Sequence, residues 1–181
     1  MGIIKPLEMK HVVMSVPHSG TRTLQTYLSE SRPELIPEFH DQVGHWHFNF
    51  HPHYVGKFFM YADSLADGRM AYIPVRNPYD VIDSWERRYF NGGEDKQVKT
   101  NIGPAISLMV TCVDNHADHI EIFKMEDLPV IRGVGPNPEG WDKAETLKSR
   151  RLQDLKKWIH DQSAVEAFYR TYYTAEELWW L

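Results

Sequence analysis

The sequence has little that would tie the protein to a membrane, to nucleic acid or to an oxidising compartment. Its 181 residues include one cysteine, Cys112, which excludes an internal disulfide bond and fits a reducing environment. The net charge of -5 argues against non-specific nucleic-acid binding, which needs a basic surface. No apolar run approaches the length of a membrane span, and the N-terminal residues lack the apolar core of a signal peptide. We therefore expect a soluble cytoplasmic protein that acts without a membrane or nucleic-acid partner.

Internal repeats and low-complexity segments are absent as well. With 42% hydrophobic and 25% charged residues over 181 positions, the chain has the composition of a globular protein and the length of one domain, residues 1–181. Segments that predict strands alternate with segments that predict helices, which is typical of a mostly parallel sheet covered on both faces. We therefore expect a three-layer α/β/α fold. The expected strands cover residues 11–16, 41–50, 70–75 and 119–123, and the expected helices cover 20–29, 57–65, 78–90, 102–115 and 143–160.

One residue fits this pattern poorly. Pro74 lies inside the expected strand 70–75, and a central strand disfavours proline because a ladder hydrogen bond is lost. Either Pro74 lies at a strand end or at a bulge, or the strand does not cover residues 70–75.

Residues 12–24, with the sequence VVMSVPHSGTRTL, predict an apolar strand that breaks into a polar turn and then a helix. The first amides of a helix are unpaired and lie at the positive end of its dipole, so such a turn attracts anions. The turn lacks the Gly-x-x-x-x-Gly-Lys-Ser/Thr pattern, which disfavours an ordinary nucleotide triphosphatase. Taken alone, the turn is equally typical of a capped helix without a ligand.

Residues 73–85, with the sequence IPVRNPYDVIDSW, repeat the strand-turn-helix pattern. Asn77 suits the helix N-cap and Pro78 the first helical position. Arg76 follows the strand end directly, where ligands bind in open α/β sheets, and Ser84 lies eight residues later. Taken singly, the pair predicts a surface arginine and a helical serine. Two anion-binding turns at one sheet edge predict a ligand with phosphate at two ends.

Taken together, these segments resemble the sulfotransferases that use 3′-phosphoadenosine 5′-phosphosulfate (PAPS). Residues 17–23 are similar to the family's Pro-Lys-Ser-Gly-Thr-Thr-like loop, and residues 76–84 match its Arg-(Asp/Asn)-Pro-x-Asp-Val-x-x-Ser element. Residues 123–128, with the sequence FKMEDL, are similar to its later Tyr-Glu-Asp-Leu segment. The resemblance implies a fold like that of the P-loop NTPases and transfer of a sulfonate from PAPS to a hydroxyl, or less readily an amine. The product would be adenosine 3′,5′-bisphosphate.

The resemblance also implies the residues that bind the nucleotide. The first loop would hold the 5′-phosphosulfate, Arg76 and Ser84 would hold the 3′-phosphate, and Arg132 with Gly133 would approach the adenosine or the 3′-phosphate. The loop residues concerned are Pro17, His18, Ser19, Gly20, Thr21, Arg22 and Thr23.

The loop departs from the family at one position. The lysine that steadies the transferring sulfonate falls at His18, which is not a constitutive cation. Arg22, one helical turn later, could supply the missing charge, and both residues are therefore candidates for a catalytic role.

A histidine-rich segment, residues 44–50, lies between the two phosphate elements. It resembles the Gly-His segment of the heparan sulfate 2-O-sulfotransferase group, which implies that His45 is the general base. His47 would share its face if the segment is a strand, because side chains two residues apart point the same way. Nearby aromatic residues would suit a phenol or the face of a sugar as the acceptor. These residues are Trp46, Phe48, Phe50 and Tyr54.

Other interpretations stay open. With His51 and His53, the histidines form two H-x-H pairs that permit a metal site, although no carboxylate or cysteine ligand has convincing spacing, and we assign no metal. The segment could also be purely structural. The chain could bind PAPS or a related nucleotide without catalysis, since the loop lysine is missing, or it could be a P-loop phosphotransferase.

Near the C-terminus, Thr174 and Glu177 predict a capping box for a last helix that ends in Trp179 and Trp180.

Overall fold

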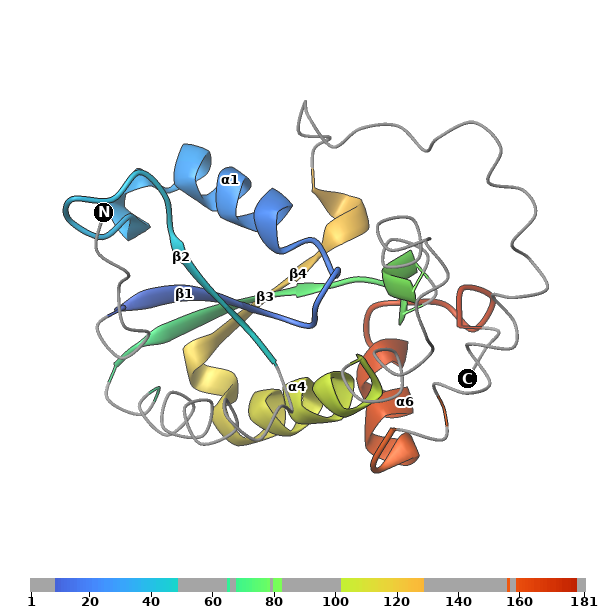
Figure 1. Cartoon of the computed structure of the whole chain (residues 1–181). Coiled ribbons are helices and arrows are strands. Elements are labelled where there is room, and N and C mark those ends of the chain that lie inside the picture. Colours follow the sequence, from blue (N-terminus) through green and yellow to red (C-terminus); the bar gives the residue numbers. More distant parts are fainter. Residues whose placement is uncertain are drawn as a thin grey trace, which may run out of the picture.

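The computed structural model describes residues 9–48, 65, 68–78, 80–82, 102–128, 156 and 159–178. Four parallel strands form the sheet in the order β2-β1-β3-β4 (Figure 1). The strands are β1 (His11–Ser15), β2 (Gly44–His47), β3 (Met70–Val75) and β4 (Ile120–Lys124). The expected α/β architecture with a mostly parallel sheet is confirmed for these residues, in which all four strands are parallel, with strand positions close to those that the sequence predicted.

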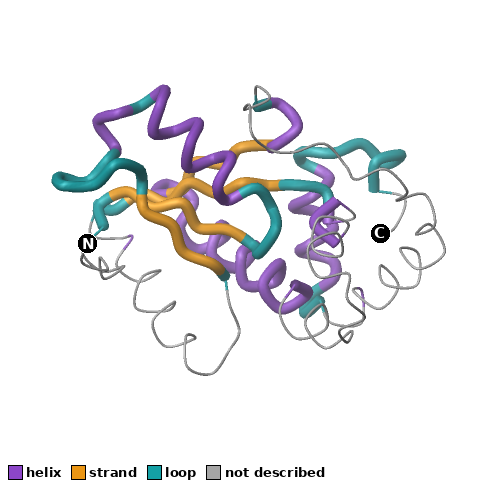
Figure 2. The backbone as a smooth tube through the Cα atoms, turned by 45° about the horizontal axis from the view of Figure 1, so that its top comes forward, coloured by secondary structure: helices purple, strands orange, loops and turns teal. Residues whose placement is uncertain are grey.

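Helices lie on both faces of the sheet (Figure 2). The helices are α1 (Thr21–Ser31), α4 (Gly103–His116) and α6 (Gln162–Arg170), with single 3₁₀ turns η2 (Pro33–Leu35), η5 (Ala117–His119) and η6 (Met125–Asp127). The apolar residues of α1 form one core cluster with Val13 and Tyr72, whereas those of α4 and α6 form another with Val12 and Met14. Because successive residues of a strand face opposite sides of its sheet, the two clusters lie on opposite faces. None of the helices in the described ranges has the length and apolar character needed to span a membrane.

Strand register fixes which polar side chains approach the α1 face. On that face Val13 pairs with His45 and Ser15 with His47, whereas Met14 pairs with Trp46 on the α4 face. Ser15 is the last residue of β1 and is completely buried. A polar group buried at the end of an apolar strand needs hydrogen-bond partners, and those partners define the site described below.

The position of Pro74 explains how a central strand accepts a proline. The pairs between β3 and β1 end at Val13 with Tyr72, whereas those with β4 continue through Pro74 with Phe123 to Val75 with Lys124. Pro74 therefore lies in the half of β3 that is paired on one side only. Pro74 thus lies beyond the end of the pairing between β3 and β1, although it is still inside β3.

Polar bonds from α1 hold the edge strand β2 in place. The Gln25 side-chain amide donates to the Val43 carbonyl at 2.7 Å, and the Val43 amide donates to Ser29 Oγ at 3.1 Å. Leu24 and Leu28 are fully buried against β1 and β3. The middle and last part of α1 and the start of β2 are thus fixed relative to each other.

The C-terminal part contains a helix that the sequence reading missed. The side chain of Asp161 accepts the Ala164 amide at 3.1 Å and caps α6, and Val165 and Tyr169 are buried. The signal was available, because an aspartate followed by apolar residues at helical spacing predicts a helix start. The helices expected over 57–65 and 143–160 lie largely outside the described residues.

Candidate anion-binding site at the carboxyl edge of the sheet

The carboxyl ends of all four strands meet at one edge of the sheet, because the strands are parallel. The loop 16–20 leaves β1, the turn 76–77 leaves β3, and η6 leaves β4 (Figure 1). Neighbouring strands lie about 4.8 Å apart, so the loops that follow them begin side by side. The two turns that the sequence singled out do share an edge, on adjacent strands.

The loop 16–20 is a tight turn closed by Ser19. The Ser19 amide donates to the Val16 carbonyl at 3.1 Å, and the Ser19 hydroxyl donates to the same oxygen at 2.7 Å. His18 and Gly20 have left-handed backbone, with φ of 66° and 105°. The turn therefore curls over the end of β1 and delivers the chain directly into α1.

The N-terminus of α1 has the features of an anion site. Its first intrahelical bond runs from the Leu24 amide to the Gly20 carbonyl at 3.0 Å, so the amides of residues 21–23 precede the helical bonding pattern. Gly20, the N-cap, provides no capping side chain, and the first turn contains no acidic residue. It contains Arg22 instead, which is exposed. A cation at the positive end of a helix is unfavourable unless an anion binds there.

Gly20 also lies under the η6 turn. A Cβ atom at Gly20 would lie 2.5 Å from the Met125 methyl group and 3.1 Å from its sulfur. Glycine is favoured at this position by its left-handed φ, whereas the end of the flexible Met125 side chain would have to shift to admit a Cβ atom. The loop after β1 is packed against the loop after β4.

A buried hydrogen-bond chain joins the first residue of α1 to β2. Ser15 Oγ lies 2.6 Å from Thr21 Oγ1 and 3.1 Å from His47 Nδ1. Ser15 is completely buried, Thr21 is 8% exposed and His47 is half-buried. The structure therefore holds the His47 ring by one nitrogen, next to the N-terminus of α1.

His45 and His47 face the same side, as strand alternation predicts, with ring centroids 5.5 Å apart. Burial lowers the pKa of His45 below its ordinary value of 6.5, and the nearby charge of Arg22 lowers it further. Burial also lowers the pKa of His47, as does His45, while a hydrogen bond to the Ser15 backbone opposes the shift. Both rings are therefore neutral at neutral pH, and a neutral imidazole can accept a proton.

The neighbouring aromatic residues correct the sequence-based picture of an acceptor site. Phe48 is completely buried and Trp46 packs against the α4-side core cluster. They alternate with His45 and His47, so they face the other side of the sheet. Neither residue lies beside the two histidines as a wall for the acceptor. Phe50 and Tyr54 lie outside the described residues.

The second turn begins a helix as predicted. The Asp80 and Val81 amides both approach the Asn77 carbonyl, at 2.8 and 3.1 Å, with Pro78 as the first helical residue. Arg76 follows the end of β3 and is partly exposed. Residues 76–77 therefore lie at the sheet edge as the sequence predicted. Ser84, the expected partner of Arg76, lies outside the described residues.

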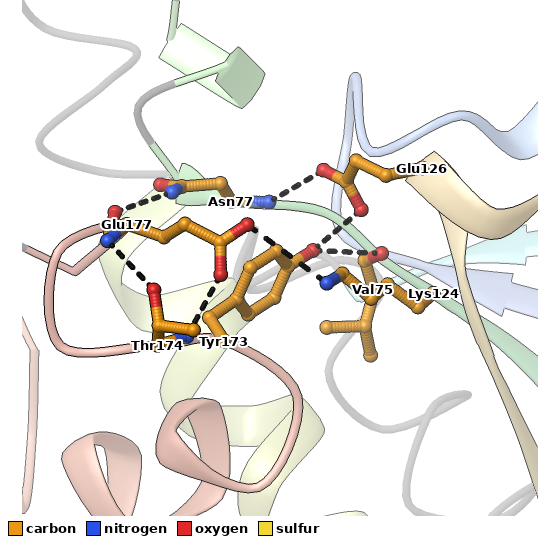
Figure 3. A network of polar contacts seen from close by, with 7 residues as sticks. All are labelled: Val75, Asn77, Lys124, Glu126, Tyr173, Thr174 and Glu177. Atoms are coloured by element: carbon orange, nitrogen blue, oxygen red, sulfur yellow. Dashed lines mark hydrogen bonds and ion pairs between the residues drawn. The ribbon is translucent and has the colours of Figure 1, made fainter.

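A polar network fixes this second turn (Figure 3). The Asn77 amide donates to Glu126 Oε1 at 3.5 Å. The Tyr173 hydroxyl lies 2.9 Å from Glu126 Oε2 and 3.2 Å from the Val75 carbonyl, and shares its hydrogen between them. Lys124 lies over the Tyr173 ring, with its Nζ 4.7 Å from the ring centroid. The turn after β3 is held by residues from β4, η6 and the C-terminal segment.

The hydrogen bonds of the predicted capping box near the C-terminus are present, but residues 175–178 form turns and not the start of the expected helix. The Thr174 amide donates to Glu177 Oε2 at 2.8 Å, and the Glu177 amide donates to Thr174 Oγ1 at 3.3 Å. The Asn77 side chain donates to the Glu177 carbonyl at 2.7 Å, and Lys124 Nζ lies 3.9 Å from Glu177 Oε1 (Figure 3). The box therefore docks the C-terminal segment onto the turn after β3. Trp179 and Trp180 lie outside the described residues.

Several predicted residues fall where the structure gives no description. These are Ser84, Arg132, Gly133, His51 and His53. Within the described ranges, no group of three or more His, Cys, Asp and Glu side chains is placed to hold a metal ion.

The sequence reading missed Ser15, Met125 and Tyr173. Ser15 carried a usable signal, since it is the one polar residue in the run VVMSV. The contacts of Met125 with Gly20 and of Tyr173 with Glu126 join positions 105 and 47 residues apart, and no local pattern encodes them.

Comparisons of the chain with family models, with curated proteins and with solved structures found no match. Its function therefore has to be inferred from the residues of the site.

Proposed function

We propose that this protein is a sulfotransferase that transfers a sulfonate from PAPS to a hydroxyl, or less readily to an amine. We propose for it a fold like that of the P-loop NTPases. The observation that carries the proposal is the pairing of two anion-binding elements on adjacent strands. At the start of α1, the amides of residues 21–23 precede the helical hydrogen bonds, and the first turn contains Arg22 and no carboxylate. Arg76 follows β3, the strand next to β1. A nucleotide with phosphate at both ends can bridge the two.

The two elements would divide the ligand between them. The loop 17–23 would hold the 5′-phosphosulfate through amides and hydroxyls, and Arg76 with Ser84 would hold the 3′-phosphate. The left-handed turn and the bare N-cap at Gly20 suit close approach of an oxyanion to the backbone.

Arg22 is the better replacement for the missing loop lysine. It is a constitutive cation in the first turn of α1, and its charge lowers the pKa of His45, so it acts on the space beside β2. His18 remains the second candidate, because it occupies the position of the lysine in the resemblance.

The general base would be one of the two β2 histidines. The resemblance selects His45, whereas the geometry favours His47, because its Nδ1 is held by Ser15 and a catalytic base is commonly oriented by a third group. In the transfer, the bond from sulfur to the phosphate oxygen breaks and a bond from sulfur to the acceptor oxygen forms. The acceptor proton goes to the free ring nitrogen, and adenosine 3′,5′-bisphosphate leaves.

The proposal is tested by ligand preference and by Arg76→Ala. Adenosine 3′,5′-bisphosphate should raise the melting temperature more than AMP or ATP. Arg76→Ala should weaken the bisphosphate strongly and AMP little, because a charged hydrogen bond of this kind is worth roughly 1.5–3 kcal/mol. Arg170→Ala is the matched control, since Arg170 is exposed and bonded to Glu166 on α6. A preference for ATP would contradict the proposal and favour a phosphotransferase.

A second function is favoured by the histidine at the position of the loop lysine. A protein that binds the bisphosphate without catalysis would show the same ligand preference and the same effect of Arg76→Ala. The two functions are separated by incubating the protein with PAPS and a panel of phenols and sugars. Sulfonated product that is lost in the His45→Ala, His47→Ala double variant supports the enzyme.

A further inference from the structure

The hydrogen-bond chain from Thr21 through Ser15 to His47 leads from the anion-binding turn to a candidate base. Its two links measure 2.6 Å and 3.1 Å, and its middle member is completely buried. Each hydroxyl has one hydrogen to donate, and the neutral His47 ring carries one hydrogen on either Nδ1 or Nε2. The direction of the two hydroxyl hydrogens and the tautomer of the ring are therefore linked.

Two arrangements satisfy both links and also use the hydrogen of the buried Ser15 hydroxyl within the chain. In the first, Thr21 donates to Ser15 and Ser15 donates to His47 Nδ1, so the ring hydrogen is on Nε2. In the second, His47 Nδ1 donates to Ser15 and Ser15 donates to Thr21, so Nε2 is an acceptor and the Thr21 hydrogen points away. Only the second arrangement leaves His47 able to take a proton at Nε2.

An oxyanion at the start of α1 discriminates between the arrangements. In the free protein Thr21 is only 8% exposed, so a hydrogen pointing away from Ser15 is poorly hydrated, which favours the first arrangement. The Ser15 backbone acts in the other direction, because it accepts a hydrogen from the His47 ring. An anion oxygen bound at the turn accepts that hydrogen through a charge-assisted bond, which favours the second arrangement. In the first arrangement the Thr21 lone pairs would face the anion.

We propose that Ser15 is a positioning residue that couples anion binding at the loop 17–23 to the tautomer of His47. Binding of the anion turns His47 into the tautomer whose Nε2 accepts the acceptor proton. This inference rests on the proposed function for its catalytic meaning, but the coupling itself can be measured without any turnover.

The experiment follows the ring nitrogens of His47 by ¹⁵N NMR at pH 8, where the lowered pKa values keep His45 and His47 neutral. Inorganic sulfate and adenosine 3′,5′-bisphosphate are titrated separately. We expect each to move the His47 Nδ1 resonance from the unprotonated toward the protonated range, and Nε2 in the opposite sense. An unchanged tautomer in protein saturated with the bisphosphate would overturn the coupling and leave the proposed function standing.

Two variants break the chain at different points. Ser15→Ala should abolish the tautomer response while the bisphosphate still binds. Thr21→Val should abolish the response in protein saturated with the bisphosphate, at a lower affinity, because Thr21 belongs to the proposed binding loop. Thr26→Val, further along α1, is the matched control and should respond like the wild type. A full response in Ser15→Ala would overturn the role of Ser15, whereas absence of any anion binding in the wild type would overturn the proposed function as well.

Discussion

At the scale of single residues, Gly20 carries a requirement that can be tested. A side chain there meets the Met125 methyl group at 2.5 Å and also has to adopt φ of 105°. We predict that Gly20→Ala lowers the free energy of unfolding by roughly 1–2 kcal/mol for the left-handed backbone, plus a smaller amount for displacing the flexible Met125 side chain. Urea unfolding measures the loss.

Gly68 offers the matched control. Its φ is 84°, but no atom lies within 4 Å of the Cβ position. Gly68→Ala should therefore lose stability only through its left-handed backbone. Adding Met125→Ala to Gly20→Ala should recover the part of the loss that comes from the contact with Met125. Equal losses at the two glycines would show that Met125 yields without cost.

The pKa values of His45 and His47 predict how stability depends on pH. Both are lowered from 6.5 by burial first, so between the folded and unfolded pKa values the unfolded chain binds more protons. The free energy of unfolding should therefore fall as the pH drops below about 6.5, the ordinary pKa of histidine. The His45→Gln, His47→Gln double variant should lose less between pH 7.5 and pH 5 in urea unfolding. An identical loss would mean that neither ring is penalised by burial.

At the scale of elements, one ion pair ties the end of α1 to β4. The Arg32 guanidinium makes two bonds of 2.6 Å to the two oxygens of Glu121 and lies 5.7 Å from the Phe123 ring centroid. Lysine cannot reproduce the two-pronged contact. We predict that Arg32→Lys lowers the free energy of unfolding by about 0.5–1 kcal/mol, because both side chains are more than a third exposed.

The comparison for that prediction is Arg170, whose partner Glu166 lies four residues earlier on the same helix. Arg170→Lys should cost less than Arg32→Lys, because its ion pair links no separate elements. A cycle of Arg32→Lys with Glu121→Gln isolates the pair from other contacts of Arg32. A coupling energy near zero would assign the loss to the Phe123 contact.

The elements themselves were largely predictable, because they follow from local patterns. Apolar runs gave β1 and β3, and Asn77-Pro78 gave the helix start after β3. The alternation of β2 placed His45 and His47 on one face, yet it did not show that Phe48 on the other face enters the core. The burial of Phe48 depends on core residues on the α4 face of the sheet, which are distant in the sequence. The hydrogen bonds of Ser15 likewise join residues 6 and 32 positions apart, which local propensity does not encode.

At the scale of the whole molecule, η6 connects the two turns that we propose to bind anions. Met125 packs on Gly20 after β1, and Glu126 accepts the Asn77 amide after β3. The C-terminal segment then fixes Glu126 through Tyr173. The third segment of the family resemblance thus acts here as a structural bridge, so the distance between the two ends of the proposed nucleotide site depends on it.

The Tyr173 hydroxyl gives this dependence a test. Tyr173 is buried, and the charge of Glu126 adds to burial in raising its pKa, so the phenol stays protonated and donates. We predict that Tyr173→Phe lowers the free energy of unfolding by roughly 1.5–3 kcal/mol, the range for a hydrogen bond to a charged group. Tyr173→Phe should also weaken the binding of adenosine 3′,5′-bisphosphate more than that of AMP, because it loosens Glu126 beside the turn that carries Arg76.

Tyr172→Phe is the control, since the described contacts give its hydroxyl no hydrogen bond. Equal weakening of both ligands by Tyr173→Phe would show that the C-terminal segment supports the fold as a whole and not the Arg76 turn.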